Sequence, residues 1–74
     1  MKKVTDLDLV RGEQCEDDHE GIAVFVGRYR GLLWVSWNPA TYTATCRAFD
    51  LLVALDGETD PAERARIRAT FRTG

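Results

Sequence analysis

Hydrophobic and polar positions alternate along the stretch from Ile22 to Phe49, which reads IAVFVGRYRGLLWVSWNPATYTATCRAF. β-Branched and aromatic residues dominate this stretch, and two dipeptides typical of turns, Arg30-Gly31 and Asn38-Pro39, interrupt it. β-Branched and aromatic side chains fit a pleated surface, whereas glycine and proline punctuate it. The pattern predicts three antiparallel strands between about residues 22 and 48, joined as a β-meander by two tight turns.

A two-residue loop at Arg30-Gly31 sets the expected register of the first two strands. The expected pairs are Tyr29 with Leu32, Arg28 with Leu33, Gly27 with Trp34, Val26 with Val35 and Val24 with Trp37. With residues 38–41 as the second loop, alternation along each strand divides the side chains between two faces. The core face is expected to hold Val24, Val26, Leu33, Val35, Trp37, Tyr42, Ala44 and Cys46.

Two helices are predicted after the sheet. Residues 49–55, FDLLVAL, are too continuously apolar for a surface strand and predict a short helix that ends before Gly57. Asp60-Pro61 is typical of a helix start, with Asp as N-cap and Pro in the first turn, and predicts a helix over 61–72. Both helices are expected to cover the core face, which gives an α+β fold in one small domain, 1–74.

The first twenty residues allow two interpretations. Val4, Leu7 and Val10 lie three apart, as in a short helix, whereas Leu7, Leu9 and Arg11 alternate as in an edge strand. Either element ends at Gly12, and the pattern leaves open which one forms and which sheet face it covers. Residues 13–20, EQCEDDHE, predict an acidic loop.

Composition and charge limit the function classes. The chain has 74 residues, 45% of them hydrophobic and 30% charged, with a net charge of −2. This weak charge argues against a general polyanion binder. No run is apolar enough for a secretory signal or a membrane span, so we expect a cytoplasmic protein without a membrane partner, in which Cys15 and Cys46 stay reduced.

Sequence signatures of catalysis and metal binding are missing. His19 is the only histidine, and the chain contains no CxxC, HExxH, GxSxG or Walker motif. Cys15 and His19, four apart among acidic residues, give a weak metal signal, but zinc needs about four ligands in recognisable pairs. We therefore expect no enzymatic activity, no cofactor and no bound metal.

The second face of the predicted sheet carries the functional hypothesis, because aromatic and arginine side chains are favoured at interface hot spots. The candidate partner-binding residues are Phe25, Arg28, Tyr29, Arg30, Leu32, Trp34 and Arg47. The leading interpretation is a small non-enzymatic binding protein that docks a macromolecule, in the first place a protein, as an inhibitor or regulator. A second copy of the chain is one such partner. Small acidic proteins of this kind are often encoded by phages or mobile elements.

Two alternatives stay open. Arg64, Arg68 and Arg72 form a stripe on the last predicted helix, and together with the arginines of the sheet they are compatible with a nucleic-acid-binding module. The structural alternative is that the N-terminal segment covers the second face and turns it into another small core.

Overall fold

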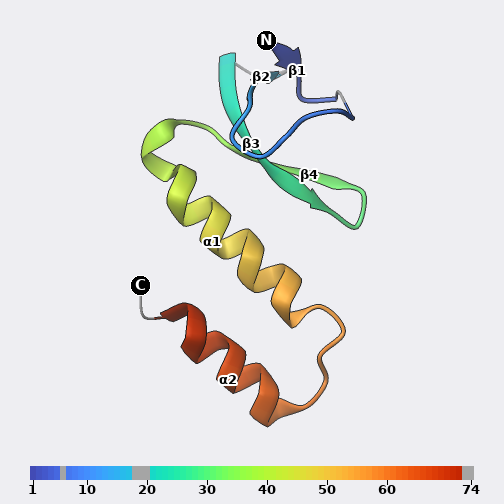
Figure 1. Ribbon diagram of the computed structural model, residues 1–74, viewed down its shortest axis with the longest axis vertical. Helices are drawn as coiled ribbons and strands as arrows, with labels where there is room; N and C mark the ends of the chain where they lie inside the picture. Colours follow the sequence, from blue (N-terminus) through green and yellow to red (C-terminus); the bar gives the residue numbers. More distant parts are fainter. Residues whose placement is uncertain (6, 18–20, 73–74) are drawn as a thin grey trace.

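Figure 1 shows the computed structural model of the protein, which describes residues 1–5, 7–17 and 21–72. A four-stranded sheet is followed by two helices, which confirms the α+β class. The elements are β1 (Lys2–Lys3), β2 (Gln14–Asp17), β3 (Gly21–Tyr29), β4 (Leu32–Ser36), α1 (Pro39–Leu55) and α2 (Pro61–Arg72). The strands lie in the order β1-β2-β3-β4, with β1 parallel to β2 and the other neighbours antiparallel.

The predicted third strand of the meander is wrong, because the residues after Asn38 form the first turns of α1. The Asn38 side chain accepts a hydrogen bond from the Thr41 backbone N–H at 3.1 Å, and Pro39 occupies the first turn. An N-cap asparagine followed by proline starts a helix rather than a hairpin. The helix predicted over 49–55 is therefore the second half of a 17-residue helix, whereas α2 has the predicted bounds.

The hairpin between β3 and β4 has the predicted turn and three of the five predicted pairs. Arg30 and Gly31 both have positive φ, 50° and 79°, as a two-residue turn of this type requires. The pairs next to the turn are as expected: Tyr29 with Leu32, Arg28 with Leu33 and Gly27 with Trp34. Beyond them a β-bulge pairs Phe25 with Val35 and Val24 with Ser36. The extra residue in β3 shifts the remaining pairs by one position.

The bulge redistributes the side chains between the two faces of the sheet. The face packed against α1, here called the helix face, contains Gly27, Trp34 and Ser36. Phe49 of α1 is buried against it, with its ring 5.7 Å from that of Trp34 in an edge-to-face arrangement. Gly27 lies directly under this ring, because a Cβ atom there would come within 2.6 Å of Phe49 Cζ. Trp37, expected in the core, is 56% exposed after the end of β4.

The opposite face of the sheet, here called the loop face, is covered by the N-terminal segment. Leu9 is buried there with Cys15, Ala23 and Phe25, and Val4, Leu33 and Val35 pack around this cluster. The segment is held by backbone hydrogen bonds that join Gly12 and Glu13 to Phe25 at 2.8 and 2.9 Å. The N-terminal segment thus forms a second small core, but on a face that combines Phe25 with Leu33 and Val35 of the predicted core face. Among the described residues between Val4 and Arg11, neither a helix nor the expected alternating strand forms.

Part of the expected acidic loop is strand β2. Cys15 pairs with Ala23, is fully buried, and has its Sγ 3.6 Å from the Ala23 carbonyl oxygen. Cys46 lies on α1, on the other side of the sheet, and both cysteines are free thiols. The expectations that concern Asp18, His19 and Glu20 fall outside the described residues.

Only one of the two helices covers the sheet. Helix α1 packs against β3 and β4, and α2 packs against α1, so that α1 lies between the sheet and α2 in Figure 1. No residue of α2 is buried, and the molecule is elongated, with extents of 42 × 25 × 19 Å. The expectation that both helices cover one sheet face is therefore wrong, since the long α1 occupies that face alone.

Candidate interaction surface

The candidate partner-binding residues do not share one face. Phe25 is 3% exposed and belongs to the core of the loop face, whereas Trp34 is half-buried on the helix face against Phe49. Arg47 is exposed on α1 and is no longer a sheet residue. The bulge and the early start of α1 account for both differences, because the predicted alternation assumed an unbroken ladder and a third strand.

Arg28 follows Phe25 onto the loop face. Its guanidinium carbon lies 4.9 Å from the centre of the Phe25 ring, which is a cation–π distance. The same guanidinium donates a hydrogen bond to the Leu7 carbonyl oxygen and so ties the N-terminal segment to the hairpin. These contacts give Arg28 a structural role.

The tip of the hairpin is anchored to the end of α1 through Asp56. The Tyr29 hydroxyl and the Arg30 guanidinium each donate to Asp56 Oδ1 at 2.6 Å, and the guanidinium also lies over the Tyr29 ring. The hydrogen bond from Tyr29, together with that from Arg30, lowers the pKa of the Asp56 carboxyl, and the same bond raises the pKa of the Tyr29 phenol. Asp56 is also the C-cap residue of α1, so the three side chains fix the hairpin relative to the helix.

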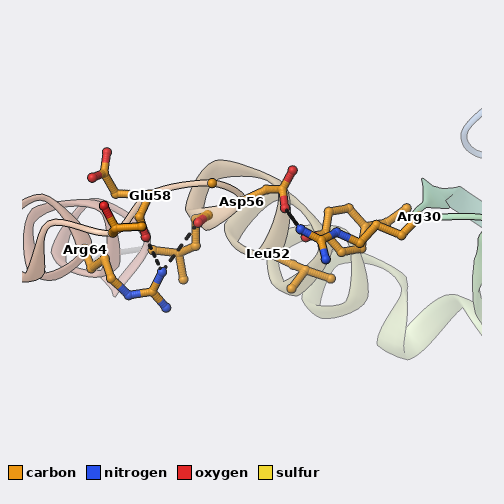
Figure 2. Close-up of a pocket in the computed structure, with 9 residues that line it drawn as sticks. Arg30, Leu52, Asp56, Glu58 and Arg64 are labelled. Atoms are coloured by element: carbon orange, nitrogen blue, oxygen red, sulfur yellow. Dashed lines mark hydrogen bonds and ion pairs between the residues drawn. The ribbon is translucent and has the colours of Figure 1, made fainter.

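A pocket of about 360 Å³ opens beside this anchor, between the hairpin tip and the loop that joins the helices. Figure 2 shows that its two arginines point at protein atoms: Arg30 at Asp56, and Arg64 at backbone carbonyl oxygens. Arg64 donates to the carbonyl oxygens of Glu58 at 2.8 Å and Leu55 at 3.5 Å. An active site needs polar groups that converge on a ligand. Here the arginines are instead hydrogen-bonded to protein atoms, and these bonds hold the hairpin tip, the end of α1 and the following loop together.

Strand β4 forms one edge of the sheet. In the part of the chain that the structure describes, β4 pairs only with β3, so its other side remains open. The strand reads LLWVS, without a charge or a proline, and each of its residues except Ser36 keeps exposed surface. Leu32 at its start is 66% exposed and Trp37 just after its end is 56% exposed. We call Leu32–Trp37 the β4 edge.

The opposite edge of the sheet is protected. Strand β1 has two residues, both lysines, and Lys2 additionally forms an ion pair with Glu13. Short edge strands and lysines are the usual means by which proteins prevent pairing with other chains. The two edges of one sheet are thus treated differently, and only the β4 edge lacks these devices.

Most arginine side chains form ion pairs or hydrogen bonds within the molecule. Arg11 pairs with Asp50, Arg30 with Asp56 and Arg66 with Glu63. Arg64 holds the loop between the helices, so the predicted stripe on α2 is reduced to Arg68 and Arg72. Nucleic-acid binding requires clustered cations that are available to phosphates. The observed pairing does not provide such a cluster on the sheet.

The sequence pattern did not predict the role of Arg11 or the exposed position of Trp37. Arg11 donates from Nε to the carbonyl oxygen of Val26 at 2.8 Å, which satisfies the backbone at the bulge, while its other nitrogens reach Asp50. No local pattern indicates such a contact. Trp37, assigned to the core, is exposed at the β4 edge. Its position just before the helix-starting Asn38-Pro39 was the available signal that the strand ends there.

Comparison with known proteins adds no assignment: no protein-family model, no curated protein and no solved structure matches this chain. Among the described residues, no helix is long and apolar enough to cross a membrane, and no three Cys, His, Asp or Glu side chains are grouped to hold a metal ion.

Proposed function

We propose that this protein is a small non-enzymatic binding module that docks a protein partner along the β4 edge. The observation that carries the proposal is the contrast between the two sheet edges. The β4 edge is uncharged and flanked by exposed Leu32 and Trp37, whereas the β1 edge is short and lysine-bearing. Such a module acts as an inhibitor or regulator by occupying its partner.

Strand addition explains why these features occur together. An extended segment of a partner pairs with an open edge through backbone hydrogen bonds, and side chains beside the strand supply specificity. Tryptophan is enriched among the residues that dominate binding energy, and leucine adds apolar area. The hairpin is held in place by the Arg30–Asp56 and Tyr29–Asp56 contacts, which limits the entropy that binding must offset.

The test uses a charge-matched pair of variants as baits for affinity capture from the native host. Leu32→Lys combined with Trp37→Lys places two charges at the β4 edge. Leu7→Lys combined with Val10→Lys makes the same change in charge at two comparably exposed apolar positions of the N-terminal segment. We expect a protein that the wild-type chain and the N-terminal variant retain and that the β4 variant loses, since a Trp hot spot is worth about 2 kcal/mol or more.

Two outcomes contradict the proposal. Equal retention of the captured protein by all three baits would place the interface elsewhere. Retention of nucleic acid alone, falling steeply with salt, would instead favour the nucleic-acid-binding alternative. Circular dichroism of each bait before capture separates loss of binding from loss of folding.

A further inference from the structure

We propose that the β4 edge binds a second copy of this chain, so that two antiparallel β4 strands join two sheets into one continuous sheet around a two-fold axis. This inference rests on the proposed function, because it uses the same edge. It goes further by naming the partner and the register. Three features of the β4 side of the molecule carry it: the direction of the backbone groups, the side chains at the axis, and the flank of α1.

Backbone direction along β4 permits self-pairing. Tyr29 and Leu32 flank the two-residue turn and form a hydrogen-bonded pair, so the next pair, Arg28 with Leu33, is a non-hydrogen-bonded one. The N–H and C=O groups of Leu33 therefore point away from β3. The bulge lies in β3, so alternation along β4 is unbroken and Val35 points the same way. Strand β4 thus offers two outward-pointing residues, Leu33 and Val35, to an antiparallel partner.

A two-fold axis at Trp34 brings these groups together. Leu33 of each copy then faces Val35 of the other, and the two pairs exchange four N–H···O=C bonds. Trp34 faces its own copy as a non-hydrogen-bonded pair, in which Cα atoms are about 4.5 Å apart and side chains are closest. Aromatic pairs at such positions stabilise antiparallel sheets. Exposed Leu32 lies on the same face as Trp34 and extends this apolar contact at both ends.

The flank of α1 above β4 is also suited to a second copy. Thr41 shares a hydrogen bond with Ser36 at 2.7 Å, which places that side of α1 over β4. The helical spacing i, i+4, i+7, i+11 puts three further uncharged residues on the same side. These residues are Thr45, Ala48 and Leu52. Since α1 packs over β3 and β4, a strand spacing of about 4.8 Å sets two such helices roughly 10 Å apart. Packed helices lie 8–10 Å apart.

Charge does not oppose the pairing. Neither Leu32–Ser36 nor this α1 flank contains a charged residue, and the whole chain carries only −2. In an isologous interface, side chains at the two-fold axis meet their own copies, so like charges there would repel. Their absence from both layers of the described β4 side, strand and helix, is what self-association requires.

Sedimentation velocity from about 1 μM to 1 mM, the range of weak to moderate protein affinities, measures the association. The expected result is a concentration-dependent species with twice the 8.3 kDa mass of one chain. Leu32→Lys should weaken the dimer at least about tenfold, because it places two charges beside the axis. Leu7→Lys, on the N-terminal segment, should leave the dissociation constant unchanged. A chain that stays monomeric throughout this range overturns the inference.

Amide hydrogen exchange tests the register independently. The N–H groups of Leu32 and Trp34 are bonded to β3 and should be protected at every concentration. Those of Leu33 and Val35 should exchange quickly in the monomer and become protected as the dimer forms. A dimer in which Leu33 and Val35 stay unprotected, or one that Leu7→Lys weakens as much as Leu32→Lys does, contradicts pairing through β4.

The same measurements separate this inference from the proposed function. A monomeric chain that still captures a protein through the β4 edge disproves self-pairing and leaves the docking function intact. A β4 dimer combined with partner capture that the β4 variant does not affect supports self-pairing and contradicts the docking of another protein at this edge.

Discussion

Gly27 determines how closely α1 approaches the sheet. A Cβ atom at this position would lie 2.6 Å from Phe49 Cζ and 2.8 Å from Cε1, distances that packed atoms do not adopt. Gly27→Ala should therefore destabilise the fold by about 1–3 kcal/mol through overpacking. Chemical denaturation measures this change.

A double-mutant cycle supplies the control for Gly27. Phe49→Leu removes part of the ring that the new methyl group would strike, so the two substitutions together should cost less than the sum of their separate costs. Simple additivity would show that Gly27 and Phe49 do not share this contact.

The two tryptophans provide a second prediction at the residue scale. Trp34 is half-buried against Phe49, whereas Trp37 is 56% exposed. Trp34→Ala should cost about 2–3 kcal/mol, less than the 3–5 kcal/mol typical of a fully buried ring, and Trp37→Ala should stay within about 1 kcal/mol. Urea denaturation of both variants gives the comparison. The reverse order would mean that the ladder is unbroken and that Trp37 belongs to the core.

The sequence pattern placed Trp37 in the core and Trp34 on the other face, and this difference from the structure shows what residue patterns could and could not predict. The turn at Arg30-Gly31 and the three pairs beside it follow from local chemistry, since a two-residue loop with glycine allows few geometries. The bulge has no comparable signal. Its carbonyl oxygen, at Val26, accepts a hydrogen bond from Arg11, fifteen residues away, whose guanidinium also reaches Asp50 of α1. Tertiary contacts of this kind are invisible to periodicity.

At the scale of elements, the start of α1 was within reach of sequence reasoning. Asn38-Pro39 has the same N-cap and first-turn chemistry as Asp60-Pro61, which correctly predicted α2. The threonine-rich segment after it favours strands by propensity, but Tyr42, Cys46 and Phe49 recur at helical spacing. Packing of that stripe against the sheet outweighs the small propensity differences among single residues.

The contact between the β3–β4 hairpin and the end of α1 should stabilise the fold to an extent that depends on pH. The folded-state pKa of Asp56 is lowered by its hydrogen bonds from Tyr29 and Arg30. Its contribution to stability is therefore fully present above the ordinary value of 3.8 and is lost as pH falls through the lowered value. In thermal unfolding, the melting temperature of wild type should exceed that of Asp56→Asn by a constant amount above about pH 5, and this difference should shrink toward about pH 3.

Asp8→Asn is the control for this pH dependence, since Asp8 is exposed on the N-terminal segment. It should differ little from wild type throughout the pH range. Glu13 and Glu63 also have lowered pKa values, but both remain in every variant, so their acid titration cancels in the difference. A difference for Asp56→Asn that persists unchanged at low pH would show that its carboxylate is not the stabilising form.

At the scale of the whole molecule, stability is unevenly distributed. The residues buried most completely lie around β3, whereas α2 has none and packs only against α1. The described contacts of α2 outside its own helix include Arg64, which donates to carbonyl oxygens at the end of α1 and in the following loop. A helix with so little buried surface opens locally before the rest unfolds.

Native-state hydrogen exchange should resolve this difference. Amides of α2 should exchange through a local opening, whereas those of β3 should require unfolding of the whole domain. Ile67→Ala, on the half-buried side of α2, should lower protection in both α2 and β3, because its contacts are lost in the local opening and in global unfolding alike. Val26→Ala, at the fully buried bulge, should lower protection in β3 by about 1–3 kcal/mol and leave α2 unchanged, because the sheet stays folded during the local opening of α2. If Val26→Ala lowers protection equally in α2, then α2 unfolds together with the sheet, and the elongated molecule is one cooperative unit.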